Sequence, residues 1–272
     1  MATGAGFDLD GRVVIVTGGL GQLGASFANA LVAAGGRVAV LDVSDDRSRA
    51  KLPLADVGEE RLRLFAADVT SKDSLRAALD RIQRAWGAPY GLINNAAIDA
   101  PPGAPASENG PFEDYPDSSL GRMLDVNVKG VVYCCQVFGG AMAKAGKGSI
   151  VNISSIYGML SPDQSLYQYR RDRGEDFYKP VGYSVTKSAL MNLTRYLAVY
   201  WGKAGVRVNT LTFAGVFANQ DPEFLEPYTR KVPLGRMAEP EDYDGPVVFM
   251  MSEASRYMTG ANVVIDGGFT AM

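Results

Sequence analysis

Short apolar runs alternate with longer amphipathic stretches along most of the chain. Seven runs rich in Val, Ile and Leu predict buried strands, at residues 12–17, 37–42, 61–66, 90–93, 149–154, 206–211 and 262–266. Helical periodicity between them predicts helices at residues 22–34, 71–86, 118–129, 130–144, 182–201 and 241–252. This alternation predicts an α/β protein with a parallel seven-stranded sheet, doubly wound, with helices on both faces.

Two irregular stretches interrupt the alternation. Residues 99–117 contain five prolines, and residues 158–180 are rich in tyrosine and arginine. Loops of this length inside a compact domain are usually functional. Because no shift in composition marks a linker, we interpret residues 1–272 as a single domain in which residues 158–180 form an insertion.

The composition narrows the chemistry. The 272 residues include no histidine, which excludes a Ser-His-Asp triad, a histidine-ligated zinc and a histidine general base. The 27 Lys and Arg against 30 Asp and Glu give a net charge of −3, so no basic field points to nucleic acid or anionic lipid. Acid–base chemistry must then use tyrosine, lysine, aspartate, glutamate or water.

The cysteines and the apolar segments indicate a reducing compartment. Cys134 and Cys135 are adjacent, so we expect them to pack as small apolar side chains and to form neither a disulfide nor a metal site. No signal peptide is evident, and the longest uncharged run, residues 130–143, is too short to span a bilayer. The expected location is cytoplasmic, with no membrane partner.

The turn after the first predicted strand carries a glycine pattern typical of phosphate binding. Gly19, Gly21 and Gly24 match G-x-G-x-x-G between a strand and a helix. Such glycines permit a tight turn and a close approach of pyrophosphate, and the helix N-terminus offers free N–H groups to the anion. A tight connection without a ligand is the alternative.

Asp42 ends the second predicted strand, 23 residues after Gly19 (42 − 19). A carboxylate at this place can bind the ribose hydroxyls of adenosine and repels a 2′-phosphate, which favours NAD over NADP. The alternative is a helix-capping role for Asp42.

A tyrosine and a lysine stand four residues apart at the start of the predicted helix 182–201. Tyr183 and Lys187 would therefore lie on one helix face. A nearby ammonium would lower the pKa of the tyrosine from its usual value of about 10 and make it a credible proton acceptor. Because such a pair also arises by chance, its weight comes from polar residues such as Asn94 and Ser155 at the ends of neighbouring strands.

Together these motifs resemble the short-chain dehydrogenase/reductase family over almost the whole chain. The resemblance implies a Rossmann-type fold and a catalytic tetrad of Asn127, Ser155, Tyr183 and Lys187. It also implies the following contacts to the cofactor NAD: Gly18, Gly21, Gln22, Leu23, Asp42, Asp68, Val69, Asn95, Ala96, Ala97, Tyr183, Lys187, Gly215 and Val216.

The resemblance gives each member of the tetrad a role. Tyr183 would exchange a proton with the substrate oxygen while hydride moves to or from nicotinamide, and Lys187 would hold the nicotinamide ribose and keep Tyr183 acidic. Ser155 would bind the substrate oxygen, in preference to its neighbour Ser154, and Asn127 would position a water that leads to Lys187. The alternative is an inactive relative that uses these residues for packing.

The sequence departs from the family pattern at several positions. The glycine turn reads T-G-x-x-G-x-x-G, with Gln22 in place of a glycine, a form seen in longer members that modify nucleotide-sugars. Ala97 replaces a usual glycine, and Phe213-Ala214-Gly215 stands where Pro-Gly is usual. Ala218 replaces a threonine that often binds the carboxamide, so the expected anchoring of nicotinamide is weaker than that of adenosine.

The largest departure is the separation of 28 residues between Ser155 and Tyr183 (183 − 155), which holds the insertion. With the Asn-Asn-Ala-Ala and Phe-Ala-Gly-Val segments, this feature resembles bacterial members of the family assigned to flagellin or surface-sugar modification. We interpret the insertion as a wall of the substrate pocket that offers cations and phenols, namely Arg170, Arg171, Arg173, Tyr167, Tyr169 and Tyr178. The alternative is an interface loop whose arginines are balanced by Asp172, Glu175 and Asp176.

The resulting hypothesis is an NAD-dependent oxidoreductase that interconverts a secondary alcohol and a ketone. Its substrate would be a small molecule of the sugar or aminosugar type, with or without a phosphate. The alternatives are a nucleotide-sugar epimerase or dehydratase with bound NAD, and a non-enzymatic NAD-sensing protein. Residues 130–144 and 182–201 resemble helices that pair subunits in this family, so a homotetramer or homodimer is expected, and no metal is expected.

Overall fold

The computed structural model describes residues 6–99 and 108–272. Seven strands form one sheet: β1 (Val13–Thr17), β2 (Arg37–Asp42), β3 (Leu62–Ala66), β4 (Gly91–Asn94), β5 (Gly148–Ser155), β6 (Val206–Phe213) and β7 (Asn262–Ile265). Their order across the sheet is β3-β2-β1-β4-β5-β6-β7, and every pairing is parallel. The predicted doubly wound parallel sheet is confirmed, and the strand ends differ from the predicted ones by at most two residues.

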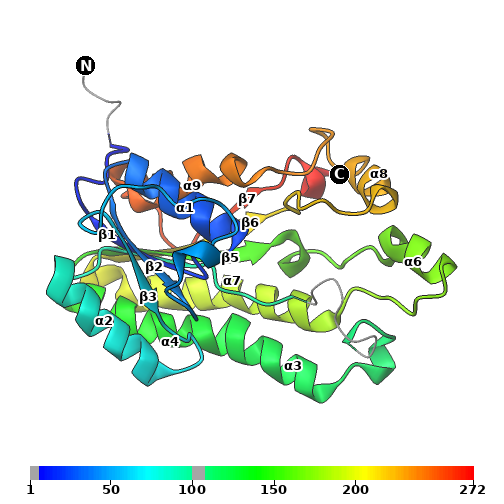
Figure 1. The fold of residues 1–272 in the computed structure, drawn as a ribbon, viewed down its shortest axis with the longest axis horizontal. Coiled ribbons are helices and arrows are strands. Elements are labelled where there is room, and N and C mark those ends of the chain that lie inside the picture. The colour runs from blue at the N-terminus through cyan, green and yellow to red at the C-terminus, as the bar shows by residue number, and fades with distance from the viewer. Residues whose placement is uncertain (1–5, 100–107) are drawn as a thin grey trace.

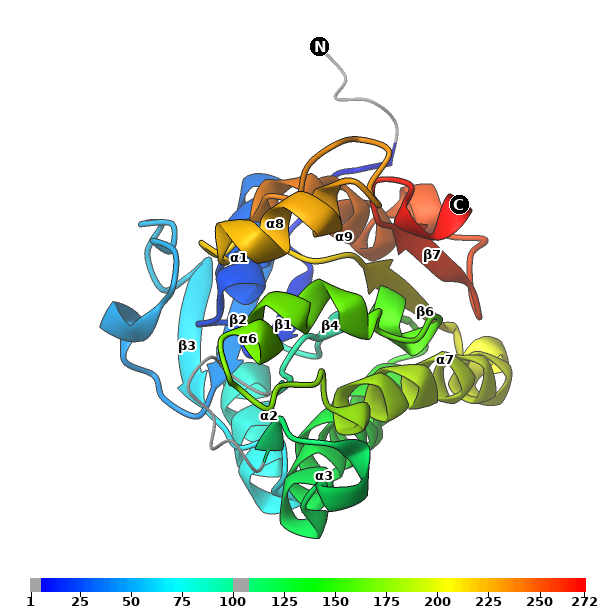
Figure 2. The ribbon, with the colours of Figure 1, turned by 90° about the vertical axis from the view of Figure 1, so that its right-hand side faces the viewer.

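Helices cover both faces of the sheet (Figure 1). They are α1 (Gln22–Ala33), α2 (Lys72–Trp86), α3 (Asp117–Leu124), α4 (Val131–Cys134), α5 (Gly140–Lys144), α6 (Gln168–Asp172), α7 (Val181–Trp201), α8 (Pro222–Thr229) and α9 (Asp244–Met251). Helices α1 and α9 lie on one face, and α2, α4 and α7 lie on the other (Figures 1 and 2). Within residues 6–99 and 108–272, none of the helices combines the length and the apolar character that crossing a membrane requires.

Each face of the sheet buries its own apolar core. Along β1, Val14 and Val16 belong to the core beneath α1 and α9, whereas Val13 and Ile15 belong to the core beneath α2 and α7. A strand buried on both faces has no polar side, which is why this strand is an unbroken apolar run in the sequence.

The predicted helix boundary at Gly130 is wrong. Residues 117–144 form one helical stretch in which α3, α4 and α5 are joined by π-helical turns at Asp125–Gly130 and Cys135–Gly139. A Cβ on Gly130 would lie 2.9 Å from Cγ2 of Val69. Glycine here permits a close approach between the helix and the segment after β3, and it does not end the helix.

The two cysteines lie in this same stretch and are buried and free. The side-chain amide of Asn94 donates a hydrogen bond to Sγ of Cys135, and burial raises the pKa of the Cys135 thiol to about 12. The prediction that Cys134 and Cys135 pack as small apolar side chains is confirmed.

Two segments that the sequence pattern did not resolve into elements meet at the carboxyl ends of the strands. Helix α6 lies within the insertion, and α8 follows β6; in Figure 2 both stand in front of the strand ends. Their contact is aromatic, because the ring of Tyr167 lies 5.1 Å from that of Phe177 and 5.5 Å from that of Phe224. We call this apolar cluster, which also contains Leu166, Tyr228 and Val232, the aromatic roof.

Candidate active site

The turn between β1 and α1 is shaped by its glycines. Gly18 has a φ of 62°, in the left-handed region that favours glycine. A Cβ on Gly24 would overlap the carbonyl oxygen of Gly18, so only glycine lets α1 begin this close to β1. The N-cap residue Gly21 gives the helix no side-chain hydrogen bond. The first amides of α1 are therefore available to an anion.

Asp42 lies directly beside this turn. Its Oδ2 accepts a hydrogen bond from the amide of Leu20 at 3.0 Å, and its Oδ1 accepts one from the amide of Val43 at 2.9 Å. The alternative of a helix cap is wrong, because the short 3₁₀ turn that follows is capped by Asp46. The carboxylate therefore braces the glycine turn from the end of β2.

The end of β4 supports the turn from the other side. Nδ2 of Asn95 donates to the carbonyl oxygens of Thr17 and Gly18, each 3.1 Å away. The amides of Asn95 and Ala96 both donate to Oγ1 of Thr17 at 3.1 Å. Asn95 and Ala96 thus lie next to the turn as expected, although the side chain of Asn95 is used to hold backbone.

The remaining expected contacts near the adenosine lie at neighbouring strand ends. Asp68 follows β3, and its Oδ1 accepts hydrogen bonds from the amide and hydroxyl of Thr70 at 2.8 and 2.7 Å. Val69 lies against Gly130, and Ala97 follows Ala96 after β4.

The loop after β6 is tied to α1 and α8. Nε2 of Gln22 donates to the carbonyl oxygen of Phe217 at 2.9 Å. The amide of Gly215 donates to the hydroxyl of Tyr228 at 2.7 Å, and Val216 forms an isolated parallel bridge. Gln22, which departs from the family pattern, therefore has a structural role in connecting the two ends of the site.

Asn127 joins two parts of the site through its side chain. Its Oδ1 accepts from the amide of Ile98 at 2.8 Å, and its Nδ2 donates to the carbonyl oxygen of Ile98 at 2.8 Å and to Oγ1 of Thr186 at 3.1 Å. Both amide hydrogens are thus used within the protein. The expected role of positioning a water cannot fall to these hydrogens, and the side chain instead positions the segment after β4 against α7.

The two serines at the end of β5 have different partners. Oγ of Ser154 donates to the carbonyl oxygen of Lys187 at 2.9 Å, which fixes β5 to α7. Oγ of Ser155 accepts from the amide of Tyr157 at 3.2 Å, and the Ser155 hydroxyl lies close enough to the phenol of Tyr183 to lower its pKa. The structure therefore pairs Ser155, and not Ser154, with the tyrosine.

Tyr183 and Lys187 are brought together but in a desolvated setting. Burial raises the pKa of Tyr183, the charge of Asp99 raises it further, and the neighbouring Ser155 hydroxyl lowers it. Nζ of Lys187 donates to the carbonyl oxygen of Ile153 at 2.9 Å and lies 5.6 Å from the centre of the Tyr183 ring. Burial lowers the pKa of Lys187 to about 8. The prediction of a lowered tyrosine pKa is wrong for this arrangement, because burial and the charge of Asp99 outweigh the lowering by Ser155.

The sequence analysis did not identify an ion pair that lies beside Tyr183. Nζ of Lys179 forms an ion pair with the carboxylate of Asp99 and lies 5.2 Å from the centre of the Tyr183 ring. The signal that could have found it is spacing: Lys179 precedes Tyr183 by four residues, just as Lys187 follows it by four.

The arginines of the insertion, which we expected to form an anion-binding wall, are all held by contacts within the protein. Each of the three has partners within the protein: Arg170 with Glu175, Arg171 with the carbonyl oxygens of Gln164 and Phe177, and Arg173 with Asp221 and Glu223. These contacts hold the insertion together and attach it to the start of α8.

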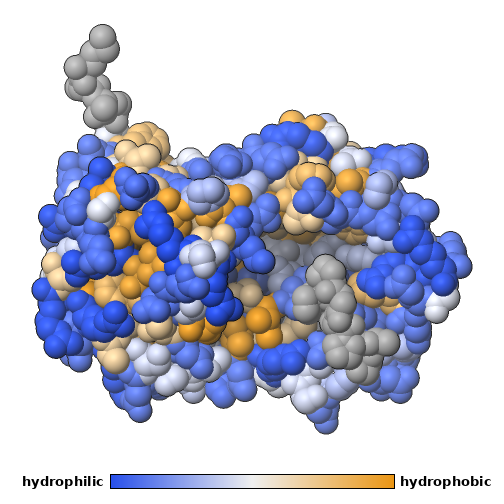
Figure 3. Space-filling view, in the orientation of Figure 1, coloured by the Kyte–Doolittle hydropathy of each residue, from blue (hydrophilic) through white to orange (hydrophobic). Residues whose placement is uncertain are grey.

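A cavity of about 820 Å³ is lined by residues that neighbour Tyr183 in the chain, among them Val181 and Ser184, although none of the four tetrad residues is part of its lining. Tyr115, Tyr157, Lys179 and Ser184 are among its lining residues. The Ser184 hydroxyl is buried and has no hydrogen-bond partner among the described residues. The surface is hollowed on this side, between the part that holds α8 and the part that holds α3 (Figure 3). Aromatic rings with a few polar groups are typical of small-molecule sites.

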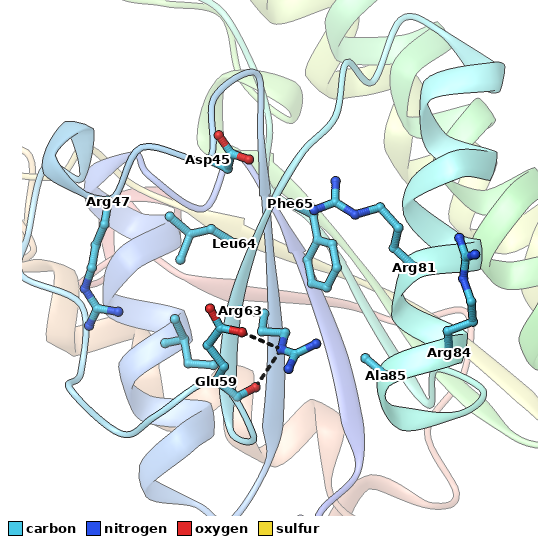
Figure 4. A pocket seen from close by; sticks show the side chains of 10 residues that line it. Asp45, Arg47, Glu59, Arg63, Leu64, Phe65, Arg81, Arg84 and Ala85 are labelled. Carbon is cyan, nitrogen blue, oxygen red and sulfur yellow. Dashed lines mark hydrogen bonds and ion pairs between the residues drawn. The ribbon is translucent and has the colours of Figure 1, made fainter.

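A second depression, of about 660 Å³, lies at the edge strand β3 (Figure 4). Arg63 points outward from β3 and pairs with Glu59, and Arg81 and Arg84 extend from α2. The guanidinium of Arg81 lies over the ring of Phe65 at 5.0 Å. Neither the tetrad residues nor their neighbours in the chain line this depression, so it is separate from the cavity beside Tyr183.

Comparisons with known proteins agree with this geometry. A family model described as enoyl-(acyl carrier protein) reductase matches residues 21–270. The chain is 30% identical to an NADH-dependent L-xylulose reductase of Ambrosiozyma monospora, with 97% of each chain covered. It is 34% identical to a 3-alpha-(or 20-beta)-hydroxysteroid dehydrogenase of Mycobacterium bovis, over 97% of this chain and 91% of that protein.

A solved structure extends the likeness to three dimensions. The short-chain dehydrogenase of Leptospira borgpetersenii, crystallised with bound NAD⁺, matches with a TM-score of 0.83 and 32% identity, over 97% of this chain and 94% of that one. The sheet order and the glycine turn define a nucleotide-binding α/β protein of the Rossmann type. More specifically, the chain belongs to the short-chain dehydrogenase/reductase family, and it is an enzyme that acts on CH–OH groups.

Proposed function

We propose that the protein interconverts a secondary alcohol and its ketone with NAD(H), on a polar substrate of the sugar or aminosugar type. The observation that carries this proposal is the partly buried Tyr183, whose phenol lies beside the hydroxyl of Ser155 and which stands one helical turn from Lys187. This arrangement can hold an oxygen between two hydroxyls and move a proton at that oxygen.

The residues around the glycine turn fit a dinucleotide. The uncapped first turn of α1 would hold the pyrophosphate, with Gly18, Gly21 and Leu23 in the turn. The carboxylate of Asp42, beside the turn, would bind the adenosine ribose and repel a 2′-phosphate, which supports NAD over NADP. The remaining proposed contacts are Asp68, Val69, Asn95, Ala96 and Ala97 on the adenosine side and Gln22, Gly215 and Val216 toward nicotinamide. When bound, the dinucleotide accepts a hydride from the alcohol carbon or returns it to the ketone carbon.

The tetrad would carry out the proton transfer of the same reaction. Ser155 and the phenol of Tyr183 bind the substrate oxygen, and Tyr183 takes the hydroxyl proton during oxidation or gives its own proton during reduction. Burial favours the protonated phenol, so the arrangement seen here is poised to donate. Lys187 lies close enough for its ammonium to stabilise the phenolate that remains. Asn127 acts as a positioning residue, because it holds Ile98 and Thr186 on either side of the site.

NADH formation from polyols and sugars by the purified protein tests this function. We expect NADH to accumulate in proportion to alcohol consumed, and Tyr183→Phe to lose at least about a hundredfold in kcat while still binding NAD. A nucleotide-sugar epimerase or dehydratase would convert its substrate without net NADH, and an NAD-sensing protein would keep its function in Tyr183→Phe. Either result would refute the dehydrogenase assignment.

We also propose that the protein assembles as a homodimer or homotetramer through α7. Tyr196 and Tyr200 stack on each other on the outer face of this helix and are 64% and 66% exposed, and Val199 between them is 85% exposed. An exposed apolar stripe of this kind is typical of an interaction surface. Trp201, in contrast, packs against Gly139 in the core. Light scattering of Tyr196→Asp/Tyr200→Asp should report a monomer, and a monomeric wild-type protein would contradict the proposal.

A further inference from the structure

The ion pair between Asp99 and Lys179 has no part in the proposed proton transfer, yet it lies beside Tyr183. The Lys179 side chain is 13% exposed and that of Asp99 is 37% exposed. Burying a lysine this far costs free energy that an exposed ion pair would not. Its ammonium also lies over the face of the Tyr183 ring, 5.2 Å from the centre. A charged group is thus held close to the reacting position.

The insertion fixes the backbone of Lys179. Oε1 of Gln164 accepts from the amide of Lys179 at 2.9 Å, and Nε2 of Gln164 donates to the carbonyl oxygen of Lys179 at 3.1 Å. Arg171 in turn donates to the carbonyl oxygens of Gln164 and Phe177 at 2.7 and 2.8 Å. Pro180 follows and restricts the backbone of Lys179 to extended conformations. The arginine-rich segment therefore holds the backbone of Lys179 in place.

Asp99 is held from the opposite side of the site. It follows Ile98, whose amide and carbonyl groups are both bound by the side chain of Asn127 at 2.8 Å. Because Asn127 also contacts Thr186 on α7, the backbone that leads to Asp99 is attached to the helix that carries Tyr183. Two segments that are distant in sequence are thus clamped so that their charged side chains meet next to the tyrosine.

The chemistry of the pair suits a neutral hydroxyl. A carboxylate accepts hydrogen bonds and an ammonium donates them, whereas a hydroxyl can do both at once. A phosphate or carboxylate would gain from Lys179 but would be repelled by Asp99. In a vicinal diol or an α-hydroxyketone, the second oxygen is on the neighbouring carbon, so it can reach the pair while the first stays between Ser155 and Tyr183.

We infer that Asp99 and Lys179 recognise a second hydroxyl of the substrate, on the carbon next to the one that reacts. The substrate class is therefore polyols and hydroxyketones, and not isolated alcohols or sugar phosphates. This inference rests on the proposed function. The cavity supports it, because Lys179 lines the same cavity as Ser184, whose buried hydroxyl has no hydrogen-bond partner within residues 6–99 and 108–272. The charge of Asp99 also raises the pKa values of Tyr157, Tyr183 and Lys187, as expected for a carboxylate placed among them.

Substrate pairs that differ by one hydroxyl test the inference. With the full chain and NAD, we would compare kcat/KM for cis-1,2-cyclohexanediol with cyclohexanol, and for 2,3-butanediol with 2-butanol. The wild-type protein should prefer each diol by about tenfold or more. Lys179→Met and the isosteric Asp99→Asn should lower kcat/KM for the diols by roughly tenfold to a hundredfold more than for the mono-alcohols. Lys179→Arg, which keeps the charge, should retain part of the preference.

Lys231→Met is the matched control. It removes the ion pair between Lys231 and Asp163, which attaches the insertion near α8 without reaching Tyr183, and should leave the diol preference unchanged. Equal losses on diol and mono-alcohol in Asp99→Asn and Lys179→Met would overturn the inference and assign the pair to positioning Tyr183. Wild-type values of kcat/KM for both the diol and the mono-alcohol in the two variants would also overturn it. A wild-type protein that forms no NADH from any alcohol would instead refute the proposed function, and the inference with it.

Discussion

The side-chain amide of Gln22 donates a hydrogen bond to the backbone carbonyl oxygen of Phe217, across 2.9 Å. This bond connects the first residue of α1, beside the proposed pyrophosphate position, with the loop after β6, which would lie toward nicotinamide. A glycine at position 22, as in the family pattern, could not make this connection. The departure at Gln22 is therefore accompanied by a new link within the proposed cofactor site.

Gln22→Ala should weaken NAD binding. Losing one partly buried hydrogen bond costs about 1 kcal/mol, so we expect the Kd for NAD to rise roughly fivefold as the loop loses its tether. Fluorescence titration with NAD measures the change. Asn29→Ala, which removes side-chain hydrogen bonds to Pro53 and Ala55 away from the loop after β6, is the control. An unchanged Kd in Gln22→Ala would show that the tether does not contribute to binding.

Two substitutions at Asp42 should separate the effect of its charge from the effect of its hydrogen bond to the glycine turn. Asp42→Asn removes the charge but keeps an oxygen that can accept from the amide of Leu20, whereas Asp42→Ala removes both. We expect the preference for NAD over NADP to fall in both variants, and binding of NAD to fall further in Asp42→Ala. The shift of the thermal midpoint with saturating NAD, NADH, NADP and NADPH measures this, because a ligand of the native state raises the midpoint. If Asp42→Asn keeps the full NAD preference, the carboxylate charge does not select the cofactor.

The buried Lys187 should make stability depend on pH. Its pKa falls from 10.5 in the unfolded chain to about 8 in the folded protein, so the folded state binds fewer protons between these values. The cost of burying the charge is present below about pH 8 and is relieved as the pH rises toward 10.5. From about pH 7 to about pH 10, the free energy of unfolding of the wild-type protein should therefore rise relative to that of Lys187→Met by roughly 2 to 3 kcal/mol.

Chemical denaturation of both proteins at the two pH values gives this difference and cancels the other titrating groups. Lys203→Met serves as the control, because this lysine lies in the exposed turn after α7 and should show no such dependence. A difference that stays constant with pH would mean that the folded protein does not depress the pKa of Lys187.

Arg173 should act through α8 and not through substrate charge. It pairs with Asp221 and Glu223 at the start of that helix, and all three side chains are partly exposed, so we expect little change in the thermal midpoint of Arg173→Gln. The loosened roof should raise KM a few-fold, equally for a phosphorylated substrate and its neutral analogue. Steady-state kinetics on both substrates measures the two KM values. A KM that rises only for the phosphorylated compound would support the anion-binding interpretation.

The sequence predicts the fold well because its strands are buried on both faces and their apolar runs are unambiguous. It also places Ser155, Tyr183 and Lys187 correctly at the strand ends, since motif position fixes the strand and helix that carry them. The pair of Asp99 and Lys179 was missed because its members are 80 positions apart, and the spacing of Lys179 from Tyr183 says nothing about Asp99. The predicted helix boundary at Gly130 is wrong for a different reason. In a sequence, a glycine needed for close packing against Val69 cannot be distinguished from a glycine that ends a helix.

The aromatic roof links any movement of the insertion to a movement of α8. Tyr167 contacts Phe177 within the insertion and Phe224 on α8, so these two segments share a single small core. Parting them would expose that core to water, and neither segment can swing away without the other losing apolar contacts. The insertion and α8 should therefore move as one cooperative unit, and a perturbation on either side of the aromatic roof should be felt on the other.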